Sequence, residues 1–223
     1  MEKQRLITVK GIGTLKIPVD FIEVEFELRE LNKDYEQGYS IFENSIYDLQ
    51  KIITSLGFNK EELKTSEIDV KPDYDSIKKN GNYVQVFKGY IFDCELKLRF
   101  DLNSKKLAEL LKAVSKSKAK PRIDIEFTVK DKEAVKKNLL AASAKDAREK
   151  AEILCNSLDV KLGKLLKINY NWDEITINSP TRYSLDDNIL LWQEEYTTTG
   201  IDSFTPDDIC VNDDASFVWE ITD

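Results

Sequence analysis

Residues 21–28, with the sequence FIEVEFEL, contain the pattern that most restricts what this chain can fold into. Glu23, Glu25 and Glu27 alternate with the apolar side chains of the same stretch. An extended strand points successive side chains to opposite faces, so the pattern predicts a β-strand with one face in water and one in a core. A sheet with one buried face needs a layer of structure that covers it.

The first covering element is predicted at residues 35–56. Apolar side chains recur there at spacings of three and four, which places them on one face of a helix. The apolar stripe consists of Tyr35, Tyr39, Phe42, Ile46, Leu49, Ile53 and Leu56. Asp34 stands where an N-cap belongs, and Gly57 stands where a left-handed C-terminal cap belongs.

Two further helices are predicted. One begins at Asn103 or Ser104 and ends before Pro121, and the other runs from Asp131 to about residue 158. The stripe expected on the longer helix is Leu140, Ala144, Ala147, Ala151, Leu154 and Leu158. Its small alanines allow a close approach, so we expect this helix to lie flat on a sheet.

Strands are predicted at residues 5–10, 19–31, 64–75, 83–101, 122–129, 162–172 and 209–222. Asn80-Gly81 lies between the third and fourth strands and favours a hairpin. The order of elements is therefore ββαββαβαββ. We predict an α+β fold with antiparallel or mixed sheets and three helices, either as one domain over 1–223 or with subregions at 1–80 and 81–223.

Composition excludes several classes of function. The chain has no histidine, which excludes a histidine base or histidine metal ligand, and its net charge of −8 argues against general nucleic-acid binding. No apolar run approaches the ~20 residues that span a bilayer. The first residues show no apolar leader, which predicts a cytoplasmic protein unless a leader has been trimmed from the chain.

The three cysteines, Cys94, Cys155 and Cys210, are far apart and form no C-x-x-C pair. Neither a zinc site nor a disulfide framework is indicated, and the favoured interpretation is three small buried hydrophobes. Asp residues at 207, 208, 213 and 214 lack the spacing of a calcium loop, so surface and turn roles are favoured. We expect no cofactor and no metal, and we assign no catalytic residue.

Gly11 and Gly13 form a G-x-G before Pro18. A phosphate loop needs such glycines to lead into a helix N-terminus, whereas here a strand follows and no G-K-[ST] is present. We interpret the glycines as a relaxed strand end before a proline corner, where glycine permits unusual backbone angles or a bulge.

Residues 171–208 are predicted to form an irregular acidic insertion. The segment contains Pro180, Gly200 and Pro206, has no sustained periodicity, and has Arg182 as its only basic residue. Long loops in compact domains are usually functional or disordered. Its aromatic side chains are candidates for an interface, with packing onto their own domain as an equal alternative: Trp172, Tyr183, Trp192, Tyr196 and Phe204.

Five motifs in order resemble the SIMPL-domain family. The opening ITVKGIGTLKIPVDFIEVEFEL is similar to the family's T-V-x-G-x-G strand and proline-aspartate corner, here with one residue inserted between Pro18 and Asp20. The others are LKTSEIDVKPDYD, KGYIFDCELKLRF, RIDIEFTVKDKEA and AASAKDAREKAEILCNSLDVKLGKLLKI. Asp159 stands where many relatives have glycine, and aspartate tolerates the left-handed conformation that the turn requires. The resemblance covers nearly all of the chain outside 171–208.

The resemblance implies an α+β fold and a family without established enzymatic activity. Its relatives include exported or periplasmic proteins, one of which assembles into a channel-like ring, a bacterial protein of oxidative-stress defence and a mammalian kinase-binding protein. We therefore expect a protein that is not an enzyme and that acts by self-association or by binding a protein partner. The alternatives are an enzyme with an unrecognised Asp/Glu site, which would need a cleft of converging carboxylates, and a module that binds a small ligand or a metal.

Overall fold

The computed structural model describes residues 5–79, 82–171, 175–185 and 205–223. The chain divides into two compact units, each made of segments that are distant in sequence. Unit 1 comprises Met1–Val19, Thr128–Pro180 and Asp207–Asp223, and unit 2 comprises Asp20–Phe127 and Thr181–Pro206. This division differs from the expected subregions 1–80 and 81–223, because the strands on either side of residue 80 both belong to unit 2.

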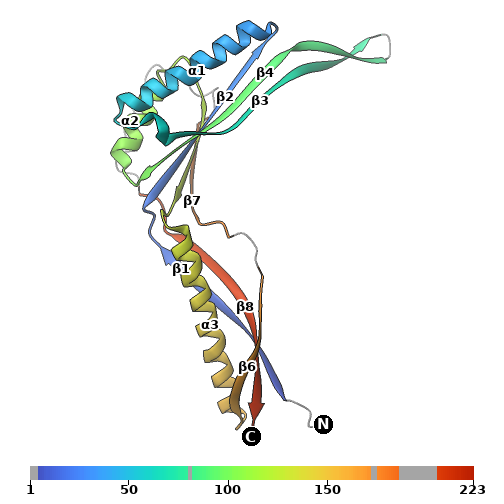
Figure 1. The fold of residues 1–223 in the computed structure, drawn as a ribbon, viewed down its shortest axis with the longest axis vertical. Coiled ribbons are helices and arrows are strands. Elements are labelled where there is room, and N and C mark those ends of the chain that lie inside the picture. The colour runs from blue at the N-terminus through green and yellow to red at the C-terminus, as the bar shows by residue number, and fades with distance from the viewer. Residues whose placement is uncertain (1–4, 80–81, 172–174, 186–204) are drawn as a thin grey trace. The chain divides into compact units, whose positions relative to one another are not determined.

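Unit 1 is a three-stranded sheet covered by one long helix. The strands are β1 (Leu6–Ile17), β6 (Lys161–Tyr170) and β8 (Ile209–Thr222), in the order β1-β8-β6, and both pairs are antiparallel. Helix α3 (Lys132–Ser157) runs along the sheet (Figure 1). The core between them contains Val9, Ala147, Ala151, Ala215, Phe217 and Trp219.

Gly11 and Gly13 are explained by the close approach of α3 to β1. A Cβ atom on Gly11 would overlap the carbonyl oxygen of Ser143 and lie 2.6 Å from the Cβ of Ala147. A Cβ atom on Gly13 would overlap the carbonyl oxygen of Leu139. Neither glycine has a positive φ, and β1 continues to Ile17 in unbroken register with β8. The prediction of a relaxed strand end or bulge was wrong, because these glycines serve helix–strand packing.

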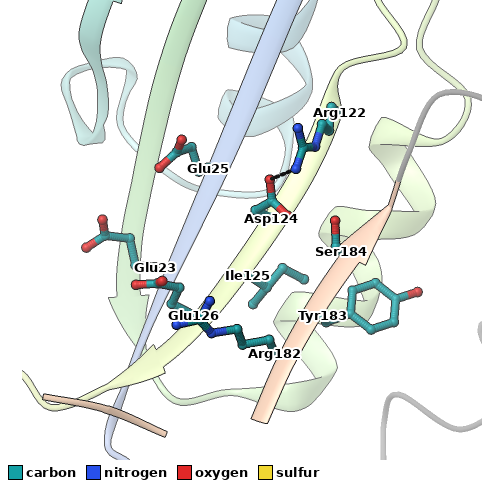
Figure 2. A pocket seen from close by; sticks show the side chains of 9 residues that line it. All are labelled: Glu23, Glu25, Arg122, Asp124, Ile125, Glu126, Arg182, Tyr183 and Ser184. Atoms are coloured by element: carbon teal, nitrogen blue, oxygen red, sulfur yellow. Dashed lines mark ion pairs between the residues drawn. The ribbon is translucent and has the colours of Figure 1, made fainter. Parts of the chain in front are cut away.

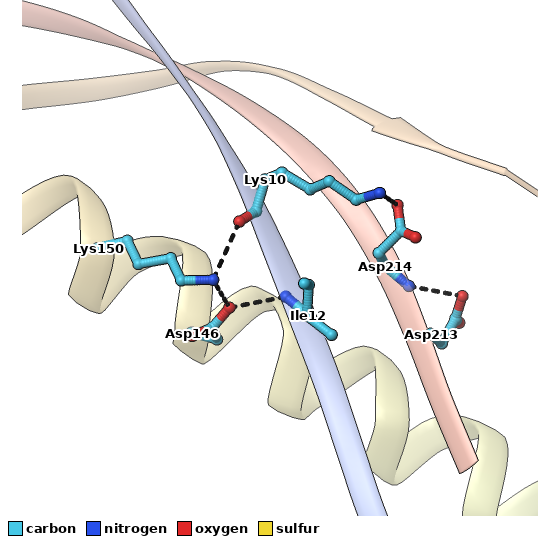
Figure 3. A network of polar contacts seen from close by, with 6 residues as sticks. All are labelled: Lys10, Ile12, Asp146, Lys150, Asp213 and Asp214. Atoms are coloured by element: carbon cyan, nitrogen blue, oxygen red, sulfur yellow. Dashed lines mark hydrogen bonds and ion pairs between the residues drawn. The ribbon is translucent and has the colours of Figure 1, made fainter.

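A polar network also holds α3 to β1 (Figure 3). Asp146 accepts hydrogen bonds from the backbone N–H of Ile12 at 2.7 Å and from the Lys150 ammonium at 2.6 Å. Together these bonds, that of Lys150 first, lower the pKa of the Asp146 carboxyl. An edge strand presents backbone N–H groups with which another chain can pair, and β1 is an edge strand of its sheet. The Asp146 carboxylate accepts from one of these groups, the N–H of Ile12.

The buried face of α3 differs from the predicted stripe. Ala147 and Ala151 are buried as expected, but Leu140, Leu154 and Leu158 are exposed. Leu139, Ser143 and Cys155 are buried instead, each one residue earlier or later than a predicted position, and Val135 is buried before the predicted stripe begins. Asp131 caps the helix by accepting from the Ala134 N–H, and Asp159 adopts a φ of 55° after its end, as predicted.

Most of a five-stranded sheet, in the order β3-β4-β2-β5-β7, belongs to unit 2. Its strands are β2 (Phe21–Asn32), β3 (Leu63–Lys79), β4 (Asn82–Asp101), β5 (Arg122–Thr128) and β7 (Asn178–Leu185). The helical elements are α1 (Tyr35–Ser55), a short 3-10 helix η1 (Lys60–Glu62) and α2 (Ser104–Val114). β2 and β3 both pair with β4 in antiparallel fashion, which confirms the predicted hairpin, while its Asn80-Gly81 tip lies outside the described residues.

The core of unit 2 lies between this sheet and its helices. The alternation of β2 is confirmed, because Ile22, Val24, Phe26 and Leu28 are buried. The opposite face carries Glu23, Glu25 and Glu27, which pair with cations. Asp34 caps α1 by accepting from Gln37, and Asn103 caps α2 by accepting from Lys106. The observed elements confirm the predicted α+β class and the predicted order of elements, to which the structure adds one strand, β7.

β7 is an additional strand within the segment predicted to be irregular. Its side chains alternate in burial, with Ser179 buried and Arg182 exposed, but its inward positions are polar, so hydrophobic periodicity is absent. Pro180 lacks the N–H that an interior strand would need, and β7 is an edge strand, the position in a sheet where proline is tolerated.

The structure predicts unequal reactivity of the three cysteines. Cys94 and Cys155 are buried, as expected, whereas Cys210 is exposed, so the prediction of three buried thiols was wrong at one position. Burial, with the neighbouring Asp93 and Glu95 carboxylates, raises the pKa of the Cys94 thiol to about 11. Because the thiolate is the reactive form, we expect one thiol per folded chain to react rapidly with a disulfide reagent at pH 8, and all three after unfolding.

Counting the released chromophore over time measures this difference. Cys210→Ser is the matched variant, and it should remove the rapid phase while leaving the total after unfolding one thiol lower. Rapid reaction of two thiols in the folded protein would contradict the burial of Cys94 and Cys155.

Candidate functional site: an exposed arm and its aromatic band

The hairpin of β3 and β4 extends beyond the rest of its sheet (Figure 1). β2 ends opposite Tyr90, so residues 82–89 of β4 pair only with β3. We call residues 73–79 and 82–89 the arm. Its side chains are exposed on both faces, apart from Gly89 at the base and Asp73 opposite it, which is partly buried. A two-stranded ribbon without a covering layer is marginally stable in water, so the arm is a candidate contact surface.

Gly89 marks the point where the arm leaves the sheet. It has a φ of 156°, and a Cβ atom there would lie 2.6 Å from the carbonyl oxygen of Asn32, the last residue of β2. The next position towards the tip, Lys88, is an extra residue, because Asp73 pairs with Gly89 and Tyr74 pairs with Phe87. This β-bulge brings two side chains spaced by three residues, Phe87 and Tyr90, to the same face.

One face of the arm continues as a row of aromatic rings onto the start of α1. Ring centroids are 5.6 Å apart for Tyr74 and Phe87, 5.2 Å for Phe87 and Tyr90, and 5.3 Å for Tyr90 and Tyr35. Tyr39 stacks on Tyr35 at 6.5 Å. We call these five residues the aromatic band. Contacts of this kind hold the rings in fixed positions relative to one another.

Four of the five rings of the band are exposed to solvent, and Tyr90 is partly buried. The exposed fractions are 48% for Tyr35, 44% for Tyr39, 53% for Tyr74 and 41% for Phe87. The prediction that Tyr35 and Tyr39 belong to the buried stripe of α1 was wrong, whereas Phe42, Leu49 and Ile53 are buried as expected. Beneath the band, the fully buried Phe92 contacts Tyr35, Tyr39 and Phe42 with centroid distances of 5.5 to 6.4 Å.

A hollow of about 480 Å³ lies elsewhere on unit 2, over the polar face of β2, β5 and β7 (Figure 2). Its lining is Glu23, Glu25, Arg122, Asp124, Ile125, Glu126, Arg182, Tyr183 and Ser184. Tyr183 is the one predicted interface residue that the structure describes, and it is partly buried here. Trp172, Trp192, Tyr196 and Phe204 lie outside the described residues, so the predicted interface stays a prediction.

The hollow has the converging carboxylates that an Asp/Glu enzyme would need, but three of them, Glu23, Glu25 and Asp124, are held in ion pairs. Arg99 contacts Glu23 at 2.7 Å and Lys97 contacts Glu25 at 2.9 Å. The hydrogen bond from Lys97 to Glu25 raises the pKa of the lysine, which keeps it charged. Cross-strand pairs of opposite charge stabilise a sheet face, and we assign that role to these residues.

Arg122, which also lines the hollow, pairs with two carboxylates. Arg122 contacts Glu27 at 3.4 Å and Asp124 at 3.3 Å, and Figure 2 shows Arg182 extending from β7 toward Glu126. Within the part of the chain that the structure describes, no group of three or more Asp, Glu or Cys side chains is arranged to hold a metal ion. The carboxylates near the start of β8 are also engaged: Asp208 with Lys16, Asp214 with Lys10, and Asp213 with the Tyr170 hydroxyl.

A model of a known protein family matches most of the chain. The model of the SIMPL family, a family of proteins of unknown function (DUF541), matches residues 7–188. The chain belongs to the SIMPL family. The match includes both glycines of the G-x-G, the aromatic band and all three helices, so the band lies within the family's domain and not in an appended segment.

A search of the curated proteins finds no match to this SIMPL protein. Among the helices in the described residues, none is both long enough and apolar enough to cross a membrane.

Proposed function

We propose that this SIMPL protein is a protein-binding module without catalytic activity, and that the aromatic band is its contact surface. The observation that supports the proposal is the mutually packed row of Tyr35, Tyr39, Tyr74, Phe87 and Tyr90, in which all but the partly buried Tyr90 are about half exposed. Tyrosine and phenylalanine bring a large contact area with few torsions to immobilise, and tyrosine is enriched among the residues that dominate binding energy. Self-association, a ring-like assembly and a role in envelope or oxidative-stress defence are part of the proposal through the family resemblance alone.

The band suits a protein partner better than a small ligand because of its shape. It runs along a twisted ribbon and one helix end, and its rings are open to solvent, whereas small-molecule sites are concave and enclose most of the ligand. The unpaired backbone edges of the arm add main-chain donors and acceptors beside the rings, which a partner strand can use.

The first test is to place a photoreactive phenylalanine analogue at Tyr74 and to irradiate the protein in cell extract. We expect a crosslinked protein adduct from position 74, because its ring is exposed within the band. The same analogue at Tyr47, an equally exposed position on α1 outside the band, is the control.

Alanine variants then measure the contribution of the rings to the captured interaction. Tyr74→Ala with Phe87→Ala should weaken binding about thirtyfold or more, since truncating a central aromatic residue costs about 2 kcal/mol or more. Ile41→Ala with Tyr47→Ala removes comparable exposed apolar surface from α1 and should leave the affinity unchanged. A protein that remains strictly monomeric by light scattering and forms no specific adduct at position 74 would refute the proposed function.

A further inference from the structure

The face of the arm opposite the aromatic band has its own pattern. The register pairs Asp75 with Val86, Ile77 with Val84 and Lys79 with Asn82, and we call each such cross-strand pair a rung. The side chains of these three rungs lie on one face, because each rung is two residues from the next along the strands. We call these six residues the second face. Its apolar members are exposed by 46% for Ile77, 44% for Val84 and 41% for Val86.

The charges of the second face are ordered along β3. A carboxylate, Asp75, and an ammonium, Lys79, stand at equal distances on either side of Ile77. The Lys88 ammonium is 3.8 Å from Asp75 and 3.6 Å from Asp73, two long contacts that leave the Asp75 side chain 61% exposed. Lys79 has no ion-pair partner among the described residues, and its two successors, Asn80 and Gly81, carry no charge. Along β3 the second face therefore runs from an acidic to a basic side chain, and reversing the strand direction reverses that order.

This pattern is complementary to itself. Suppose that a second copy lies face to face on the arm with its strands antiparallel, related by a two-fold axis that runs parallel to the Ile77–Val84 rung and midway between the two faces. Each Lys79 then lies opposite the Asp75 of the other copy. The same axis sets Ile77 against Ile77 and Val84 against Val84. Packed sheets lie about 10 Å apart, a gap that lysine and aspartate side chains from opposite faces can bridge.

We infer that the second face of the arm is a self-association surface, and that its occupant is the second face of another copy of this chain. A two-fold interface uses one patch twice, so it requires a patch that complements itself, and the order Asp75, Ile77, Lys79 meets that requirement. The arrangement covers three exposed apolar side chains per copy and places two ion pairs at the rim. Because the patch is small, the dimer is weak and depends on concentration.

Charge exchange between two variants tests both the partner and the register. Lys79→Glu sets two acidic side chains against the Asp75 residues of the partner, and Asp75→Lys sets two lysines against its Lys79 residues. We expect each variant alone to dimerise at least about tenfold more weakly than the unaltered protein, because two attractive contacts become repulsive. An equimolar mixture should restore a heterodimer, since one native Lys79–Asp75 pair then forms and the two introduced side chains, of opposite charge, meet each other.

Sedimentation velocity gives the dimer constants, and native mass spectrometry identifies the heterodimer by its mass. Lys145→Glu, on an exposed part of α3 in unit 1, is the matched charge reversal and should leave dimerisation unchanged, and circular dichroism confirms that each variant is folded. Restoration in the mixture supports the inference. An unaltered protein that stays monomeric, single variants that dimerise normally, or a mixture that fails to recover would each overturn it.

The outcome is separate from that of the aromatic band. Tyr74→Ala with Phe87→Ala changes the opposite face of the arm, so it should leave this dimer intact while it reduces binding of a different protein. Loss of the dimer in that variant would show that association uses the band and would overturn the assignment to the second face.

Discussion

Gly11→Ala is expected to destabilise the protein by about 3 kcal/mol, the upper end of the cost of overpacking a close contact. The added methyl group would overlap the carbonyl oxygen of Ser143, which is part of the α3 backbone and cannot rotate away. α3 would have to move off β1, and that movement would open the core formed by Val9, Ala147 and Phe217. Guanidinium unfolding measures the loss of stability.

Two matched variants separate this mechanism from others. Ile12→Ala changes the adjacent strand position, whose side chain is largely exposed, and should cost less than about 1 kcal/mol. Gly11→Ala combined with Ala147→Gly removes one of the crowded atoms but leaves the Ser143 carbonyl, so stability should not recover. Hydrogen exchange should show deprotection first in peptides from β1 and α3. If Gly11→Ala cost no more than Ile12→Ala, α3 would not approach β1 as closely as described.

The contrast between the G-x-G and the alternation of β2 shows which parts of the fold local sequence can predict. The alternation at Glu23, Glu25 and Glu27 and the caps at Asp34 and Asp131 depend on neighbours within a few residues. Periodicity and capping chemistry report such contacts directly. These features were predicted correctly because nothing distant in the chain alters them.

The glycines and the buried face of α3 depend on contacts between distant segments. Gly11 meets Ser143, which is more than a hundred residues away, so the reason for the glycine is absent from its local sequence. α3 has alanines at both Ala144 and Ala147, and small residues on several sides of a helix leave its apolar face poorly defined. The stripe was therefore placed partly on the wrong face.

The candidate site was harder to predict than the fold. Tyr35 and Tyr39 have the spacing of core residues, and only their hydroxyl groups, which favour water or a polar partner, indicate a position at the boundary. Tyr74, Phe87 and Tyr90 join them through a hairpin and through the bulge at Lys88, whose position is set by the pairing of two strands. Single-sequence patterns do not encode that register shift.

Phe92→Ala is the second change with a large expected effect, a loss of about 3–5 kcal/mol, typical of removing a buried phenylalanine. Phe92 is completely buried, and its ring lies under Tyr35, Tyr39 and Phe42. The packing is tight on the helix side as well, because a Cβ atom on Gly38 would come within 2.5 Å of the Phe92 ring. Guanidinium unfolding should show the loss, and hydrogen exchange should locate it first in α1 and β4.

The same substitution tests whether the core of unit 2 supports the aromatic band. With Phe92 absent, the rings of Tyr35 and Tyr39 lose the surface on which they rest, so the variant should also weaken partner capture at the band in the fraction that stays folded. Phe92→Leu retains most of the buried area and should lose clearly less stability than the alanine variant, while Tyr47→Ala, an exposed change on the same helix, should be nearly neutral. A Phe92→Ala protein with unchanged partner binding would show that the band holds its geometry through ring-to-ring contacts alone, whereas a stability loss no greater than that of Tyr47→Ala would contradict the burial of Phe92.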